Sequence, residues 1–134
     1  MGWLDKIFGS NKVVQPVSLH DGNFHDEVMR SPLPVLVDVW SDGCAPCRQM
    51  EPIVMDLASR YEGRVKVAEL HVQRAPKTLA RLGVRSTPTI LYFKKGQELE
   101  RVVGVRSSVY HRQLIDEEIL DPPAATANEK TASA

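Results

Sequence analysis

Apolar and polar positions follow two different periods along this chain. Residues 35–40 form a near-continuous apolar run with β-branched members, which predicts a strand buried on both faces of a sheet. Further on, apolar residues recur three or four positions apart, the spacing of one helix face. They are Met50, Val54, Leu57 and Tyr61. Pro52 lies inside this predicted helix and should kink it, and Gly63 should end it.

The segment before the buried run predicts a short strand and one helix. Residues 17–19 are expected to form the strand. Asn23 can cap the helix, whose buried face uses Phe24 and Val28, four positions apart. Pro32 should end it, because proline lacks the backbone N–H that a helix interior needs.

The pattern returns to strands after the long helix. Residues 65–72 predict a strand, and a short helix should run from Pro76 to Gly83, with proline at its start and glycine at its end. Residues 89–93 and 99–105 then predict an antiparallel hairpin around a turn of Lys and Gly.

A last helix completes the pattern. Ser107 or Ser108 can cap it, and Ile115 and Ile119 lie on one of its faces. The order β-α-β-α-β-α-β-β-α predicts an α/β domain, in which helical crossovers join the first three strands and the hairpin closes the sheet. Helices then cover both faces, and the end of the central strand is the natural place for a site.

Length and composition indicate one ordinary domain. The chain has 134 residues, 43% of them hydrophobic and 25% charged, which suits a single hydrophobic core. We divide it into an N-terminal lead (1–15) that can form a short amphipathic helix, a domain (16–120) and a disordered tail (121–134).

Charge and hydropathy exclude several classes of partner. Seventeen basic residues balance seventeen acidic ones, which argues against nucleic acid as a partner. No apolar stretch approaches the roughly 20 residues of a membrane span, and the N-terminus lacks the pattern of a signal peptide. We therefore expect a cytoplasmic monomer without a stable membrane anchor.

The strongest chemical signal is Cys44-Ala45-Pro46-Cys47, which follows the buried run and opens the long helix. Alone, a C-x-x-C motif could be half a zinc site, part of a disulfide framework or a redox pair. A strand that leads into a helix favours the redox pair. The free N–H groups and positive dipole end of the helix stabilise a thiolate at Cys44.

Other interpretations of the two cysteines remain open. They could be inert buried thiols, or they could bind zinc or an iron–sulfur cluster if a second chain supplied more ligands. The four histidines are scattered without the spacing expected of a ligand pair, and surface or packing roles are expected of them: His20, His25, His71 and His111. We expect no metal and no other cofactor.

Asp38 is unusual because it carries a carboxyl group inside the apolar run. Such a group is costly to bury unless it is paired or protonated, and burial raises its pKa toward neutrality. That pKa suits a base at neutral pH. A carboxylate bonded to nearby backbone or water is the alternative.

Several motifs, in this order and spacing, resemble the thioredoxin family over residues 17–120. They are Val37-Asp38-Val39-Trp40, Cys44-x-x-Cys47-Arg48, Pro52, Gly83-Val84-Arg85-Ser86-Thr87-Pro88-Thr89, Phe93-Lys94-Lys95-Gly96 and Gly104. The resemblance implies a thioredoxin fold, with a central mixed sheet of four to five strands flanked by helices on both faces. It also implies thiol–disulfide exchange.

The resemblance further implies a role for each matching residue. Cys44 is the nucleophile, Cys47 resolves the mixed disulfide, and Asp38 accepts the proton of Cys47. Pro88 is cis and lies opposite the cysteines, and the backbone of Thr87 binds the substrate chain. The expected substrate surface also includes Trp40, Gly43, Ala45, Pro46 and Gly104.

Three positions depart from the family pattern. Gly43 replaces the usual tryptophan before the first cysteine, which removes an apolar contact surface for substrates. Glu69 replaces a lysine near the buried aspartate, and if it points inward it raises the pKa of Asp38 further. Ala45 replaces a glycine, while Pro46, typical of reducing members, is present.

These observations lead to one functional hypothesis and two alternatives. The chain is expected to reduce protein disulfides through Cys44 and Cys47, with electrons from a thioredoxin-reductase-type flavoenzyme. One alternative is a reductant dedicated to a single client, which the missing tryptophan favours. The other is a thioredoxin-fold adaptor that binds partners through its lead and tail.

Overall fold

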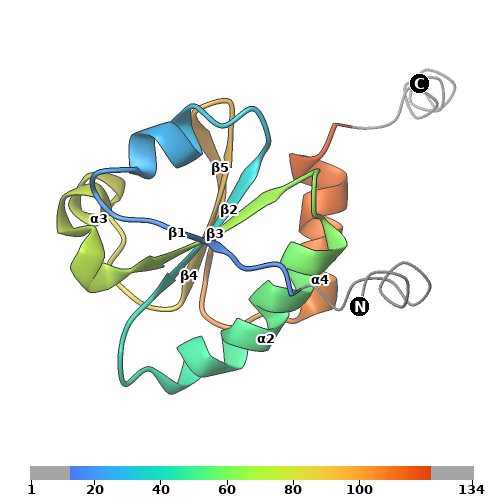
Figure 1. The fold of residues 1–134 in the computed structure, drawn as a ribbon. Helices are drawn as coiled ribbons and strands as arrows, with labels where there is room; N and C mark the ends of the chain where they lie inside the picture. The colour runs from blue at the N-terminus through green and yellow to red at the C-terminus, as the bar shows by residue number, and fades with distance from the viewer. Residues whose placement is uncertain (1–12, 122–134) are drawn as a thin grey trace, which may run out of the picture.

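The fold is built on one five-stranded mixed sheet (Figure 1). The computed structural model describes residues 13–121. The strands lie in the order β1-β3-β2-β4-β5, and their bounds are β1 (Val17–Ser18), β2 (Val35–Trp40), β3 (Lys66–His71), β4 (Thr89–Lys94) and β5 (Gln97–Val103). The first three strands pair in parallel, whereas β4 and β5 are antiparallel to their neighbours.

Helices cover both faces of the sheet, as Figure 1 shows. Helices α2 and α4 lie on one side, and α3 lies on the other with the short segment η1. The bounds are η1 (His25–Met29), α2 (Ala45–Arg60), η2 (Val72–Arg74), α3 (Pro76–Leu82), α4 (Ser108–Leu114) and η3 (Ile115–Ile119). The predicted α/β architecture is confirmed.

Each face of the sheet has its own apolar core. On one face, Leu36 of β2 packs with Met50 and Leu57 of α2 and with Ile115 after α4. On the other face, alternate residues of β2 pack with Phe24, Val28 and Leu79. They are Val35, Val37 and Val39. The central strand β2 contributes to both cores, which explains why its sequence is apolar on both sides.

Helix α2 begins and ends close to the positions that the sequence predicts. It ends at Arg60, and Gly63 lies in the following turn with a φ of 82°. The helix continues without a break through Pro52. Its buried side chains, including Met50, Val54 and Leu57, face the sheet as expected.

The capping role expected of Asn23 is wrong. The first helical segment has Phe24 at its N-cap and receives no side-chain hydrogen bond there. Instead, Asn23 Oδ1 accepts from the N–H of His20 at 2.8 Å, and Nδ2 donates to the carbonyl of Ser18 at 3.0 Å. The short amide side chain therefore stabilises the preceding turn rather than the helix.

The hairpin and the last helix follow the prediction. The turn between β4 and β5 places Lys95 and Gly96 at positive φ, and β5 begins at Gln97, two residues earlier than expected. Ser107 caps α4, with its hydroxyl accepting from the N–H of Tyr110 at 3.1 Å.

Both ends of the described chain contact the domain. Val14 packs against the core on the α2 face, and Asp121 accepts a hydrogen bond from Lys94 Nζ. The remainder of the predicted lead and tail lies outside the described residues. Within residues 13–121, no helix is long and apolar enough to cross a membrane.

Candidate active site

The two cysteines form a disulfide at the N-terminal end of α2. Cys44 is the N-cap residue and Cys47 lies one turn inside, with their Cα atoms 5.2 Å apart. Cys44 is partly exposed, whereas Cys47 is only 7% exposed. The N–H of Cys47 points at Cys44 Sγ, 3.2 Å away. The two sulfurs therefore differ in their access to another molecule.

A loop from the other half of the chain lies against Cys44. The Thr87–Pro88 peptide is cis, and the carbonyl oxygen of Thr87 lies 3.8 Å from Cys44 Sγ. The hydroxyl of Thr87 shares a 2.7 Å hydrogen bond with Ser41, which ties this loop to the one before α2. Gly104 donates its N–H to the carbonyl of Pro88 at 2.9 Å.

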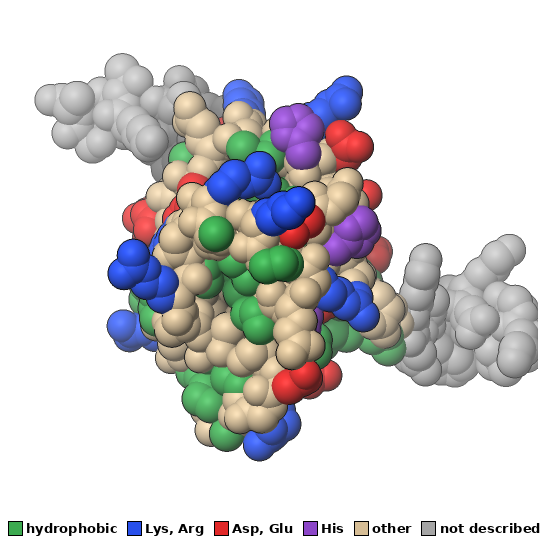
Figure 2. Space-filling view, turned by 90° about the vertical axis from the view of Figure 1, so that its left-hand side faces the viewer, with side chains coloured by type: hydrophobic (Ala, Val, Ile, Leu, Met, Phe, Trp, Pro, Cys, Tyr) green, Lys and Arg blue, Asp and Glu red, His purple; other side chains and the backbone are tan. Residues whose placement is uncertain are grey.

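The loop before α2 is open to solvent. Gly43 is exposed at a φ of 63°, and a Cβ there would meet no atom within 4 Å. Ala45 and Pro46 are exposed in the first turn of the helix. The start of α2 lies on the left-hand side of Figure 1, the face that Figure 2 turns toward the viewer. Hydrophobic side chains gather at its centre and below, with Lys and Arg around them (Figure 2).

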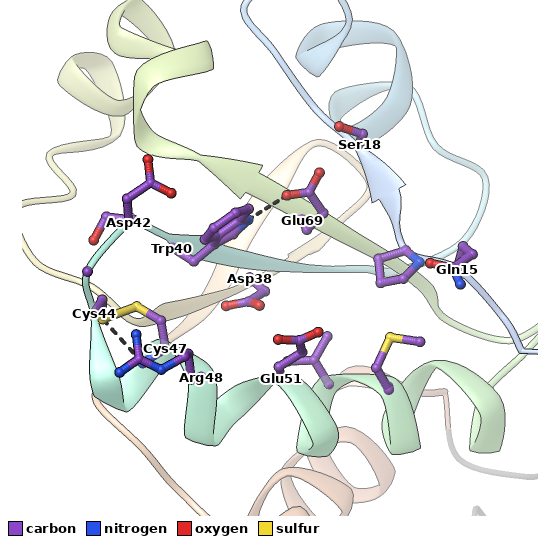
Figure 3. Close-up of a pocket in the computed structure, with 15 residues that line it drawn as sticks. Gln15, Ser18, Asp38, Trp40, Asp42, Cys44, Cys47, Arg48, Glu51 and Glu69 are labelled. Carbon is purple, nitrogen blue, oxygen red and sulfur yellow. Dashed lines mark hydrogen bonds between the residues drawn. A yellow bond between two sulfur atoms is a disulfide. The ribbon is translucent and has the colours of Figure 1, made fainter.

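Asp38 of β2 lies beside the disulfide, with its carboxyl group largely out of water (Figure 3). The residue is 7% exposed, and its Oδ1 has no hydrogen-bond partner in the described part of the chain. Burial raises the pKa of Asp38 to about 7, and the nearby carboxylates of Glu69 and Glu51 raise it as well. At neutral pH the group therefore exchanges a proton readily.

Glu69 lies beside Asp38 because of strand register. The two residues are paired neighbours on the parallel strands β2 and β3. Glu69 Oε2 accepts a hydrogen bond from the indole N–H of Trp40 at 2.5 Å. This bond holds the Glu69 carboxylate beside Trp40 rather than free in solvent (Figure 3). The inward orientation hypothesised for Glu69 agrees with this geometry.

A second contact between the ends of β2 and β3, that of Asp42 with His71, was not predicted from the sequence. His71 Nε2 lies 3.2 Å from Asp42 Oδ2, and its Nδ1 accepts from the N–H of Gln73. The His71 ring also packs edge-on against Trp40, with centroids 4.5 Å apart. Asp42 and His71 are distant in sequence, so only the pairing of β2 with β3 brings them together.

A cavity of about 570 Å³ opens between α2 and the sheet, next to the disulfide (Figure 3). Asp38 faces it from the sheet and Glu51 from the helix. Glu51 was also missed, although it follows Cys47 by four positions, one turn along the same helix face.

The other titratable residues in the described part of the chain do not form a metal centre. No group of three or more His, Cys, Asp or Glu side chains within residues 13–121 is arranged to hold a metal ion. His111 is fully buried, with Nδ1 2.6 Å from the hydroxyl of Tyr92, and burial lowers its pKa to about 4. It serves the packing of α4 against the sheet.

Comparison with known proteins agrees with this geometry. The family model described as Thioredoxin matches residues 15–117. The chain is 45% identical to "Thioredoxin" of Synechocystis sp. over 84 residues, which cover 63% of this chain and 78% of that protein. It is 43% identical to "Thioredoxin 1" of Nostoc sp. over the same shares of the two chains.

A plant protein is also similar. The chain is 40% identical over 86 residues to "Thioredoxin M-type, chloroplastic" of Pisum sativum, covering 64% of this chain and 50% of that one. Residues 15–117, which the family model matches, include the strand–helix junction that holds the disulfide. This chain is a thiol–disulfide oxidoreductase and belongs to the thioredoxin family.

Proposed function

We propose that this protein reduces disulfides in client proteins, with Cys44 as the attacking sulfur and Cys47 as the resolving one. The observation that carries the assignment is the unequal exposure of the two sulfurs. Cys44 is partly exposed at the helix tip, whereas Cys47 is buried at 7% exposure. A client disulfide can reach only the first of them.

In the first step, the Cys44 thiolate attacks one sulfur of the client disulfide. The client S–S bond breaks, a Cys44–client disulfide forms, and the second client sulfur leaves as a thiolate. The N–H of Cys47, which points at Cys44 Sγ, and the positive end of α2 stabilise the thiolate before attack.

In the second step, Cys47 releases the client. Its thiol gives a proton to the Asp38 carboxylate and attacks Cys44 Sγ, which forms the intramolecular disulfide and expels the client thiolate. Two electrons have then passed from the protein to the client. Asp38 lines the same cavity as Cys47, and this position and its pKa of about 7 support its role as the proton acceptor.

The client chain is proposed to bind across the two loops that meet at Cys44. Thr87 and Pro88 supply one wall, and the backbone of Thr87 offers hydrogen bonds to an extended peptide. The rest of this surface is Trp40, Gly43, Ala45, Pro46 and Gly104. Because Gly43 offers no side chain to contact a client beside Cys44, we infer a narrower client range than a bulky residue there would give.

The disulfide must be reduced again after each cycle. We infer that a thioredoxin-reductase-type flavoenzyme supplies the electrons, as for the family in general.

The two cysteines, placed three positions apart, suit a compartment in which thiols are kept reduced, so we propose the cytoplasm.

A redox titration tests this function. The protein is equilibrated in dithiothreitol and glutathione buffers, alkylated and weighed intact. We expect one two-electron couple near the roughly −270 mV of thioredoxins. Absence of an intramolecular couple would contradict the proposal and favour the adaptor alternative, which the relatives do not support.

Trapping identifies the attacking sulfur. A Cys47→Ser variant should accumulate mixed disulfides with client proteins through Cys44, because the resolving thiol is absent. The matched Cys44→Ser variant should accumulate none, since Cys47 is buried. Equal trapping by both variants would contradict the assigned roles.

A further inference from the structure

We infer that the cavity beside the disulfide is a binding site for a basic side chain of the client, an arginine or a lysine close to the disulfide to be reduced. This inference rests on the proposed function and adds a preference among clients. The inference rests on the charge of the cavity, its volume and one buried oxygen that has no hydrogen-bond partner among the described residues.

The cavity is strongly acidic. Among the described residues that line it, four carry carboxylates and one carries a positive charge: Asp38, Asp42, Glu51 and Glu69 against Arg48. In the described part of the chain, Arg48 forms no ion pair with any of the four. Arg48 therefore does not neutralise these carboxylates, and of the four only Asp42 lies against a basic ring, that of His71, among the described residues.

Asp38 shows where a donor would be accepted. Its side chain lines the cavity, the residue is 7% exposed, and Oδ1 has no hydrogen-bond partner among residues 13–121. A buried acceptor without a partner is destabilising, so a donor that entered the cavity would gain that hydrogen bond. Glu51 faces Asp38 from α2 and could accept from the same group (Figure 3).

The arrangement suits an organic cation better than a metal ion. No three acidic, histidine or cysteine side chains within residues 13–121 converge closely enough to hold a metal. A guanidinium group is flat and carries five N–H donors, so it can bind carboxylates that are several ångströms apart. The volume of about 570 Å³ leaves room for a long side chain.

The cavity is also within reach of a bound client. Its lining includes Gly43, Cys44 and Cys47, so it begins where the client disulfide must lie. Gly43 has no side chain to separate the reacting sulfur from the cavity, and a Cβ there would meet nothing within 4 Å. A basic residue near the client cysteine could pass over this glycine.

A bound cation would also assist the second step of reduction. The carboxylates of Glu69 and Glu51 raise the pKa of Asp38, so Asp38 is protonated in a fraction of the molecules at neutral pH. A positive charge among them lowers that pKa and increases the fraction able to accept the Cys47 proton. Clients with a basic residue would thus both bind more tightly and be released faster.

Paired peptides test the inference. Two disulfide peptides differ only in one residue beside the first cysteine, arginine in one and the neutral isostere citrulline in the other. Pre-reduced full-length protein should reduce the arginine peptide about fivefold faster, the effect of one partly screened ion pair. Equal rates would overturn the inference, whereas failure to reduce either peptide would contradict the proposed function instead.

Variants locate the preference. Glu51→Gln combined with Glu69→Gln should bring the arginine-to-citrulline ratio close to one, and a ratio that survives would overturn the inference. Glu62→Gln removes an exposed carboxylate that does not line the cavity and should keep the ratio. If the arginine-to-citrulline ratio is near one in the unmodified protein and rises in Arg48→Gln, Arg48 itself fills the cavity. That result would also overturn the inference.

A binding measurement separates the site from catalysis. The indole N–H of Trp40 donates to Glu69, so its NMR signal reports on the cavity. Titrating the oxidised protein with N-acetylarginine amide should shift this signal, and N-acetylcitrulline amide should not. Identical responses to the two compounds would contradict a cation site even if the enzyme is active.

Discussion

At the scale of single residues, the proposed role of Asp38 as proton acceptor makes the second step depend on pH. It can accept the Cys47 proton only as a carboxylate, and its pKa is about 7. The rate at which the mixed disulfide resolves should therefore rise as the pH passes through 7. Asp38→Asn should lose this rise and slow resolution at pH 8 by roughly 10²-fold, as expected for removal of a general base.

Rapid acid quenching of single-turnover reactions, followed by mass spectrometry of the mixed disulfide, measures that rate. Glu62→Gln serves as a control for loss of a carboxylate elsewhere. A rise near pH 7 that persists in Asp38→Asn would assign the proton to another group.

Burial of Asp38 should also lower the free energy of unfolding at neutral and higher pH. The pKa of Asp38 is raised from 3.8 to about 7 in the folded protein, so folding favours the protonated form. Its contribution to stability is intact below pH 3.8, declines as the pH rises toward 7 and stays low above it. At pH 8, Asp38→Asn should raise the free energy of unfolding by about 4 kcal/mol, since one pKa unit corresponds to about 1.4 kcal/mol.

Urea denaturation of the oxidised protein at pH 4 and pH 8 checks this effect. The gain from Asp38→Asn should nearly vanish at the lower pH. A gain of equal size at both pH values would mean that packing, not charge, causes it.

Glu69 tunes this carboxyl group. Replacing Glu69 by glutamine removes a negative charge beside Asp38, so the pKa of Asp38 should fall. Titration of the Asp38 carboxyl carbon by NMR in both proteins measures the change. An unchanged pKa would show that the two carboxylates do not interact.

Contacts between individual residues of different strands were the least predictable part of the site. The buried Asp38 and the C-x-x-C pair were identified from their local pattern, since an apolar strand and a helix start are local features. The contact of Asp42 with His71 was not, because it depends on which strand lies beside β2. The inward position of Glu69 was left as a hypothesis for the same reason.

At the scale of elements, α4 depends on its cap. Ser107 accepts from the N–H of Tyr110, a group that has no partner within the helix. Ser107→Ala should lower the free energy of unfolding by about 1 kcal/mol, and Ser107→Asp, which can also cap, should restore most of it. Chemical denaturation of the three proteins tests this; an equal loss in both variants would exclude capping as the cause.

Element boundaries were predictable where the signal was a cap or a turn residue. Pro76 and Gly83 bracket α3, and Ser107 begins α4, as their backbone preferences require. The start of β5 was displaced because its first residues are polar, so no apolar pattern marks them. Asn23 was misjudged because a nearby turn competed for its side chain.

At the scale of the whole molecule, residues 13–121, which include the proposed domain of residues 16–120, should act alone. The named cores and the proposed site all lie within residues 13–121. A protein without residues 1–12 and 122–134 should keep its melting temperature and its rate of client reduction. Thermal denaturation and a client-reduction assay check this, and a loss of rate at unchanged melting temperature would place a client contact in the removed ends.

The site is assembled where two halves of the chain meet. Cys44 follows β2 in the parallel half, and Thr87 precedes β4, the first strand of the antiparallel half. During synthesis from the N-terminus, the ribosome therefore releases both cysteines well before the loop that lies against them. The nascent chain therefore carries its thiols before the Thr87–Pro88 loop, the proposed client-binding wall, lies against Cys44. Prompt pairing of β4 with β2 is thus the event that turns a reactive peptide into a selective reductant.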